Sequence, residues 1–250
     1  MTASLKGRPV AVPLFAAGRA GGYAEFVTID AGSLVPLPDG LAFEDAAALM
    51  VQGLTALYLI RQCPPRGKAV LITAAVGGVG SLLVQLAKRA GASLVIAAAS
   101  SRAKLDLAAS LGVDICIDYS DASWASRVRE VIGGAGADII YEFVGGAVTE
   151  TGLEPLAPSG EIVFGALNRF GVGRPELEAM FAKNQSLRGF ALLPLLVRVD
   201  LARDLADLFD RAVRGELRVI QGGRYRLDQV AEARRVLGSR VTTGKLVLAP

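Results

Sequence analysis

The feature that most constrains how this chain can fold is a strand-like run that leads through a glycine turn into a helix. Residues 69–72 are apolar, and residues 81–90 have the composition of a helix. Between them, Ala74, Gly77 and Gly80 occupy the small positions of a G-x-G-x-x-G-type fingerprint, here in an A-x-x-G-x-x-G version. Small residues there allow a tight turn and close approach of the backbone to a pyrophosphate, which the positive end of the helix attracts. The stretch predicts a dinucleotide-binding turn, although glycine turns also occur with a purely structural role.

Strand-like and helix-like segments alternate from this turn onward. We expect further strands at 93–99, 115–118, 138–144, 161–165 and 186–192, and helices at 103–111, 122–132 and 175–184. This alternation predicts an α/β fold with a Rossmann-type doubly wound parallel sheet, whose ligands bind at the carboxyl ends of the strands. Outside this region we expect short strands at 7–12 and 23–29, helices at 43–60, 199–214 and 228–238, and a final strand at 245–248.

The composition excludes several kinds of active site. The 250 residues include no histidine and only two cysteines, Cys63 and Cys116, which excludes the usual Ser-His-Asp and Cys-His nucleophiles. For the same reason we expect no metal site, and we expect both cysteines to be spectators in a reducing compartment. The net charge of +3, with no basic tract, predicts that nucleic acid is not a partner.

No segment of the sequence indicates secretion or a membrane anchor. The longest apolar candidate, residues 190–197, is short and is interrupted by Pro194. The N-terminus lacks the cationic stretch and apolar run of a signal peptide. We therefore expect a cytoplasmic protein with no membrane partner.

The residues that follow the second expected strand indicate which dinucleotide is bound. An NAD-type site usually has Asp or Glu about twenty residues after the glycine turn, where the carboxylate binds the ribose 2′-hydroxyl. This chain has hydroxyls and cations there instead: Ser100, Ser101, Arg102 and Lys104. Such a set suits a 2′-phosphate and favours NADPH over NADH. The alternative interpretation is a capped helix start with solvated basic side chains.

Several stretches along the chain, in order and spacing, resemble the quinone oxidoreductase (zeta-crystallin-like) branch of the medium-chain dehydrogenase/reductase superfamily. They are GGYAEF (21–26), LVPLPDG (34–40), QGLT (52–55), AAVGGVG (74–80), Lys104-Leu105, Tyr119, Val144-Gly145 and TTGKL (242–246). The resemblance implies a dinucleotide-binding domain over residues 53–193 and a partial GroES-like, β-rich catalytic domain over residues 1–52 and 194–250.

The resemblance also implies binding roles residue by residue. At the pyrophosphate we expect the turn residues Ala74, Gly77, Gly78, Val79 and Gly80. At the 2′-phosphate we expect Ser100 and Lys104, with Tyr119, beside Ser101 and Arg102. Near the ribose and nicotinamide we expect Val144, Gly145, Phe164, Gly165 and Ala166. Facing the cofactor from other segments we expect Gln52, Thr55 and Arg240. No catalytic residue is identified.

The chain departs from the family pattern in four ways. Family members begin with a longer GroES-like domain, so we expect the front of that domain to be missing here. The family's Gly-Asp-Arg-Val is Gly7-Arg8-Pro9-Val10, which loses a carboxylate and a backbone donor. The usual Asn before Tyr119 is Asp118, a carboxylate near the expected phosphate subsite. After the fifth strand, residues 166–169 are bulkier and more basic than the family's polar small residues.

Two functions remain open on this reading. The first is a zinc-independent, NADPH-dependent oxidoreductase that passes a hydride to a small-molecule quinone or α,β-unsaturated carbonyl. The second is a protein that keeps the fold and the nucleotide site but acts as a non-redox enzyme (cyclisation or isomerisation) or as a binding or regulatory protein. The family's cofactor domains pair edge to edge through the sixth strand, so we also expect a homodimer. Without the front of the catalytic domain, the apolar face of the helix at 199–214 is expected to be exposed.

Overall fold

The computed structural model describes residues 5–165 and 171–250, and the chain forms two compact units. The sheet unit comprises Ala56–Val76 and Leu83–Ala191. The terminal unit comprises Met1–Thr55, Gly77–Leu82 and Leu192–Pro250. Each unit is described by itself.

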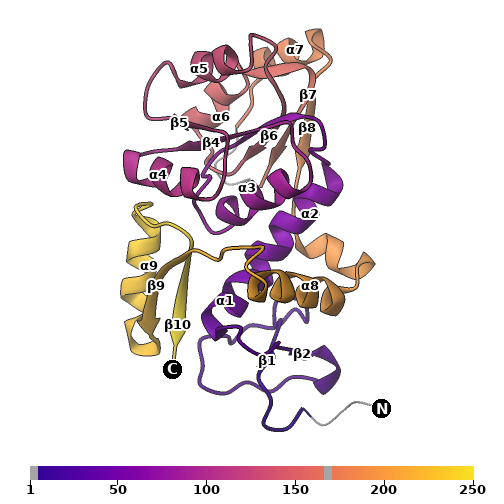
Figure 1. The fold of residues 1–250 in the computed structure, drawn as a ribbon, viewed down its shortest axis with the longest axis vertical. Helices are drawn as coiled ribbons and strands as arrows, with labels where there is room; N and C mark the ends of the chain where they lie inside the picture. The colour runs from indigo at the N-terminus through magenta and orange to yellow at the C-terminus, as the bar shows by residue number, and fades with distance from the viewer. Residues whose placement is uncertain (1–4, 166–170) are drawn as a thin grey trace. The chain divides into compact units, whose positions relative to one another are not determined.

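The sheet unit is built on six parallel strands in the order β5-β4-β3-β6-β7-β8 (Figure 1). The strands are β3 (Ala69–Ile72), β4 (Leu94–Ala99), β5 (Ile115–Asp118), β6 (Ala137–Glu142), β7 (Leu156–Phe164) and β8 (Ser186–Gly189). Because β3 and β4 carry almost only apolar side chains, they are buried on both faces, as parallel strands between helices usually are. Leu71 of β3 pairs with Ile96 of β4 on one side and with Ile140 of β6 on the other. This strand order confirms the predicted Rossmann-type α/β fold.

The helices of the sheet unit lie between successive strands of the sheet, except α2 (Leu54–Gln62), which precedes the first of them. They are the end of α2, most of α3 (Gly80–Arg89), α4 (Arg102–Ser110), α5 (Trp124–Val131), α6 (Ala147–Gly152) and α7 (Arg174–Ala182). Trp124 and Val128 of α5 and Met180 of α7 are buried in one core cluster with the strands. These helices leave the carboxyl ends of the strands as the place where the loops can hold a ligand.

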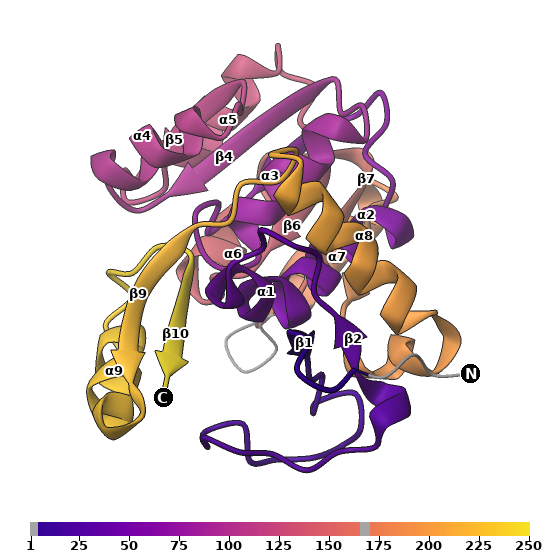
Figure 2. The same ribbon diagram turned by 60° about the horizontal axis from the view of Figure 1, so that its bottom comes forward.

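The terminal unit contains two small sheets. The antiparallel pair is β1 (Val10–Ala11) and β2 (Val35–Pro36). The parallel pair is β9 (Gln221–Arg226) and β10 (Lys245–Ala249), with α9 (Val230–Gly238) beside it in both ribbon views (Figures 1 and 2). The other helical elements are η1 (Ala31–Ser33), α1 (Phe43–Ala48), η2 (Leu49–Gly53), η4 (Leu193–Arg198), α8 (Leu201–Val213) and η5 (Leu227–Gln229).

Several sequence-based element bounds are corrected by the structure. Residues 23–29 form no strand, and β8 ends at Gly189 instead of 192. Strand β7 begins at Leu156 and not at the expected residue 161, because the chain keeps its pairing with β6 through a shift in register. Strand β9 and helix α6 were not predicted, since β9 (QGGRYR) and α6 (AVTETG) lack an apolar period.

The prediction for the apolar face of α8 is also corrected by the structure. We expected this face to be exposed, but Leu205, Leu208 and Phe209 have no solvent exposure. They are buried within the terminal unit, where the Leu208 side chain lies against Gly53 of η2. Only Val213, at the end of the helix, is substantially exposed, at 45%. This face is therefore occupied within the chain.

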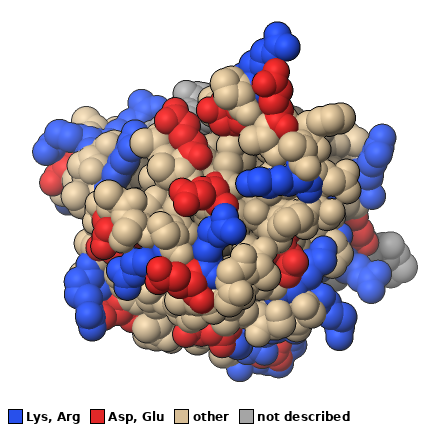
Figure 3. All heavy atoms as spheres, turned by 90° about the horizontal axis from the view of Figure 1, so that it is seen from above, with Lys and Arg blue, Asp and Glu red and all other residues tan. Residues whose placement is uncertain are grey.

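The longest apolar segment is the continuous helical run through α1, η2 and α2, Phe43–Gln62, and not residues 190–197 as expected. Its charged residues lie near its two ends, so the 20-residue run is long and apolar enough to cross a membrane by length and composition alone. More than half of its most apolar window is buried inside the structure, as in the core helix of a globular protein. On the face shown in Figure 3, acidic and basic side chains are interspersed.

Candidate functional site

In the sheet unit, the end of β4 and the start of α4 carry the residues predicted for a 2′-phosphate. Lys104 Nζ donates a hydrogen bond to Ser100 Oγ over 3.3 Å, and both residues are partly buried. Ser101 caps α4, with its hydroxyl 3.5 Å from Lys104 N. The side chain of Arg102 is 88% exposed and pairs with Asp106 one helical turn later, at 2.8 Å. The structure therefore groups Ser100, Ser101 and Lys104 and directs Arg102 to Asp106.

The end of β5 lies beside this group. Tyr119 N donates to Ala99 O, the last residue of β4, over 3.0 Å, so the two strand ends are tied together. Asp118, which we expected to bring a carboxylate to the phosphate subsite, accepts hydrogen bonds from Ser120 N (2.9 Å) and Ser120 Oγ (2.6 Å). The Asp118 carboxylate is thus already hydrogen-bonded within its own turn.

The turn after β6 is held by a buried carboxylate that sequence reasoning did not single out. Glu142 has no solvent exposure, and its Oε1 accepts hydrogen bonds from Val144 N (2.7 Å) and Gly145 N (3.0 Å). The hydroxyl of Thr73, directly after β3, accepts from Phe143 N at 3.0 Å and lies 3.3 Å from the same Glu142 oxygen. The predicted residues Val144 and Gly145 are therefore fixed by the ends of two neighbouring strands.

The end of β7 contributes Phe164 and Gly165. Gly165 N donates to Glu142 O over 3.1 Å, which continues the pairing of β7 with β6 past the end of the strands. A Cβ on Gly165 would collide with the ring of Phe143, so this position accepts only glycine while the ring stays in place. The predicted residue Ala166 lies outside the described residues.

In the terminal unit, the glycine turn is packed against the segment before β10. Gly77 forms a parallel β-bridge with Gly244. A Cβ on Gly78 would lie 3.0 Å from Gln52 Cγ and 3.5 Å from Gly244 O, so the absence of a side chain allows this close packing. The first hydrogen bond of α3 runs from Ser81 N to Gly77 O, at 3.0 Å. The turn thus leads directly into a helix, as the fingerprint predicts.

Gln52 connects the turn to a lysine. With its amide oriented to satisfy both neighbours, Gln52 donates to Ala48 O (3.2 Å) and accepts from Lys245 Nζ (3.0 Å). Burial lowers the pKa of Lys245, so this cation lies in a partly desolvated position beside the residues that contact the turn. Of the other predicted residues in this unit, Thr55 is buried and Arg240 is exposed.

The remaining predicted residue, Ala74, belongs to the sheet unit and begins the turn. Its φ of 48° lies in the left-handed region, where glycine is usual. The following residue is anchored, because Ala75 N donates to Ala98 O of β4 over 3.2 Å. A glycine at position 74, as in the more common form of the fingerprint, would relieve this backbone conformation.

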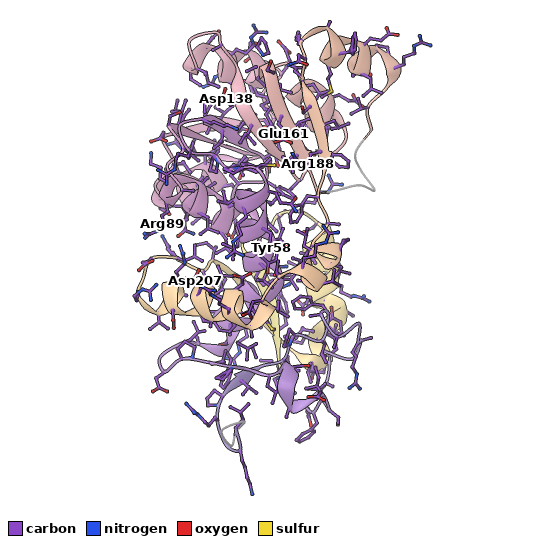
Figure 4. All side chains as sticks on the ribbon, turned by 90° about the vertical axis from the view of Figure 1, so that its right-hand side faces the viewer. Tyr58, Arg89, Asp138, Glu161, Arg188 and Asp207 are labelled. Carbon is purple, nitrogen blue, oxygen red and sulfur yellow. The ribbon has the colours of Figure 1, made fainter. Side chains whose placement is uncertain are left out.

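The two cysteines, Cys63 and Cys116, are free thiols. Burial, followed by a hydrogen bond to Glu161, raises the pKa of Cys63 to about 12, and burial also raises the pKa of Cys116. Glu161 pairs with Arg188 of the neighbouring strand (Figure 4). Thiols with raised pKa values are poor nucleophiles. Among the residues that the structure describes, no group of three or more His, Cys, Asp or Glu side chains is arranged to hold a metal ion.

The residues that sequence reasoning missed had detectable signals. Glu142 is a charged residue near the end of the mainly apolar strand expected at 138–144, and charged residues are seldom fully buried without a hydrogen-bonding role. Lys245 belongs to the matched stretch 242–246 but was not singled out. Thr73 is the last residue before the glycine turn, where a hydroxyl can bond to the next strand end.

Comparisons with known proteins agree with this arrangement. The family model described as zinc-binding dehydrogenase matches residues 78–209. A quinone oxidoreductase of Pseudomonas aeruginosa is 36% identical over 245 residues, which cover 94% of this chain and 74% of that protein. A 2-haloacrylate reductase of a Burkholderia species is 33% identical over 242 residues, with coverages of 92% and 71%. The quinone oxidoreductase of Thermus thermophilus, also solved in complex with NADPH, is similar with a TM-score of 0.79 and 33% identity, over 92% of this chain and 74% of that one.

Proposed function

Because the chain belongs to the quinone oxidoreductase branch of the medium-chain dehydrogenase/reductase superfamily, we propose that it is an NADPH-dependent oxidoreductase that reduces a quinone or an α,β-unsaturated carbonyl. The substrate class is proposed from the names of the relatives, a quinone oxidoreductase and a 2-haloacrylate reductase. Residues 1–52 and 194–250 are proposed to form the GroES-like part, and residues 53–193 the dinucleotide-binding domain.

NADPH is proposed, and not NADH, because of the hydrogen bonds and ion pairs that the charged side chains near the end of β4 form. Lys104 and Ser100 are joined by a hydrogen bond, and they supply a cation and a hydroxyl suited to a phosphate. The nearby carboxylates are occupied: Asp106 pairs with Arg102, and Asp118 accepts from Ser120. Neither carboxylate takes the place of the ribose-binding Asp or Glu of an NAD site.

The chain's own residues bind and orient the cofactor in this proposal. The sheet unit supplies Ser100 and Lys104 for the 2′-phosphate, and the ordered turn at Val144 and Gly145 for the nicotinamide half. The small residues of the glycine turn permit close approach of a pyrophosphate. When bound, NADPH supplies the hydride that the reduction requires.

We also propose that the reaction is independent of zinc, that the protein is cytoplasmic and that it forms a homodimer. The absence of histidine and the two widely separated cysteines, Cys63 and Cys116, support zinc independence. The position of β8 at the edge of the sheet supports pairing between two copies, since Leu187 of this strand is 37% exposed. A monomer at micromolar concentration in analytical ultracentrifugation would contradict the dimer.

The experiment that tests the proposed function is a titration with NADPH and NADH, followed by turnover of a panel of quinones and enones. We expect tighter binding of NADPH, and oxidation of NADPH when an acceptor is added. Binding of NADPH without oxidation by any acceptor would contradict a reductase and favour the non-redox or regulatory alternative. Equal affinity for NADPH and NADH would contradict the assignment of the phosphate subsite.

A further inference from the structure

The turn that follows β6 is organised around one buried carboxylate. Glu142 is the last residue of β6 and has no solvent exposure. Its Oε1 accepts from two successive backbone N–H groups, Val144 N at 2.7 Å and Gly145 N at 3.0 Å. Both distances lie in the normal range for N–H···O hydrogen bonds, and the bond from Val144 N is at its short end. One side chain therefore orders the backbone of the turn that the proposed function assigns to the nicotinamide half.

A threonine from the neighbouring strand end completes this arrangement. The Thr73 hydroxyl accepts from Phe143 N over 3.0 Å, and it lies 3.3 Å from Glu142 Oε1 and 3.4 Å from Tyr141 O, either of which can accept its proton. Thr73 N also donates to Tyr141 O, at 3.1 Å. The N–H groups of three consecutive residues, 143–145, are thus all bonded to Thr73 or Glu142. These hydrogen bonds join the end of β3 to the end of β6. They do so directly before the glycine turn, since Thr73 is the residue that precedes it.

The carboxylate is a costly way to hold a turn. Burying an ionised group is unfavourable unless its hydrogen-bonding capacity is met. The second oxygen, Glu142 Oε2, is buried and has no hydrogen-bond partner among the described residues. Gly145 and Gly146 both have positive φ, so the turn already has the backbone freedom it needs. A structural turn alone does not require this group, which points to a functional need for a rigid turn.

We propose that Glu142 and Thr73 are positioning residues, which hold residues 143–145 in the conformation that receives the nicotinamide half of the dinucleotide. This inference rests on the proposed function and adds to it the network that orders the site. The adenine half is assigned to Ser100 and Lys104 at the end of β4, and neither is hydrogen-bonded to Glu142 or Thr73 in the described contacts. Loss of the network therefore weakens one half of the cofactor site and leaves the other intact.

The test compares two ligands and two matched pairs of variants. NADPH occupies both halves of the site, whereas adenosine 2′,5′-bisphosphate occupies only the adenine half. Glu142→Met keeps the length of the side chain but removes the acceptor, while Glu142→Gln keeps an oxygen that can accept from both N–H groups. Thr73→Val removes the hydroxyl at nearly constant shape, and Thr73→Ser keeps it. Dissociation constants are measured by titration calorimetry.

We expect Glu142→Met and Thr73→Val to weaken NADPH by about tenfold or more, while the bisphosphate changes by less than about twofold. Glu142→Gln and Thr73→Ser are expected to remain within about threefold of the wild-type chain for both ligands. Hydrogen exchange provides a readout without any ligand: the amides of Val144 and Gly145 lose protection in Glu142→Met, and the amides of β3 and β4 keep it.

Equal weakening of NADPH and the bisphosphate by Glu142→Met would overturn the proposal, since it would show general loss of structure. Unchanged NADPH affinity in Glu142→Met or Thr73→Val would also overturn it. If Glu142→Met does not fold, Thr73→Val decides the question with the same two ligands. If the wild-type chain binds the bisphosphate but not NADPH, the proposed function fails at the nicotinamide half and the positioning role is refuted with it. If the wild-type chain binds neither ligand, the proposed function itself fails.

Discussion

Replacing Lys104 with alanine tests the phosphate subsite most directly. Lys104 and Arg102 are both cations in the first turn of α4, but the structure separates their roles. Lys104 donates to Ser100 at the end of β4 and is partly buried. Arg102 is 88% exposed and pairs with Asp106. We therefore expect Lys104→Ala, and not Arg102→Ala, to reduce the preference for a cofactor that carries a 2′-phosphate.

The magnitude follows from the interaction that is lost. A hydrogen bond to a charged partner contributes about 1.5–3 kcal/mol, and each 1.4 kcal/mol corresponds to about tenfold in affinity. Because Lys104 is only partly buried, solvent screens its charge to some degree, and we take the lower part of this range. Lys104→Ala should weaken NADPH by about 10- to 50-fold. NADH lacks the phosphate, so its affinity should change by less than about twofold.

The assay is a fluorescence titration of the wild-type chain, Lys104→Ala and Arg102→Ala with both cofactors. Raising the salt concentration should reduce the affinity for NADPH more in the wild-type chain than in Lys104→Ala. Salt screens the attraction between Lys104 and the 2′-phosphate, which the variant lacks. Equal losses for NADPH and NADH would refute the assignment of Lys104. A loss in Arg102→Ala as large as in Lys104→Ala would show that the pairing of Arg102 with Asp106 does not persist in solution.

Two further predictions concern stability. Leu208→Ala should lower the free energy of unfolding by about 2–5 kcal/mol, because Leu208 is fully buried, whereas Val213→Ala on the same helix should change it by less than about 0.5 kcal/mol; similar urea-denaturation midpoints for the two variants would contradict the packing of α8. Asp114 has a lowered pKa, since hydrogen bonds from Lys88 and Val95 N outweigh the effect of burial. Its stabilising contribution is therefore present above the ordinary pKa of 3.8 and lost as pH falls through the lower, folded-state value. The difference in melting temperature between the wild-type chain and Asp114→Asn should shrink as the pH is lowered below about 4. Lys88→Gln should retain part of the stabilisation by Asp114, because Val95 N still donates to this carboxylate. A difference in melting temperature that does not vary with pH would contradict this prediction.

Local sequence signals were sufficient for the sheet. The strand at 115–118 was predicted with its observed bounds, because three apolar residues, 115–117, lie between polar turns. The strand at 69–72 was predicted equally well, since all four residues are apolar and a turn of small residues follows. These strands lie inside a regular alternation with helices, in which each element is specified by its own residues. The order of the strands then follows from the right-handed connections of such folds.

The parts that sequence reasoning missed depend on contacts between distant residues. Strand β9 contains Gly222, Gly223 and charged residues, and it is a strand because it pairs with β10. The exposed face predicted for α8 is buried because β2 and η2, far away in the sequence, pack against it. The charge of Glu142 in a strand hints at a hydrogen-bonding role, but its contact with the Thr73 hydroxyl, 69 residues earlier in the chain, cannot be read from the local pattern. In each case tertiary contacts determine the structure, and the local sequence pattern does not reveal those contacts.

The bridge between Gly77 and Gly244 has a consequence for how the protein is made. About 170 residues separate the two glycines in the chain. At a synthesis rate of about 5–20 residues per second, the turn leaves the ribosome roughly 10 to 30 s before its partner. During that interval β3 and β4 can pair, because they are close in sequence, but Gly77 has not yet met Gly244, its β-bridge partner. Its final conformation is therefore acquired late, when residue 244 has been released, and a nascent chain stalled before that residue should hold the sheet without the completed turn.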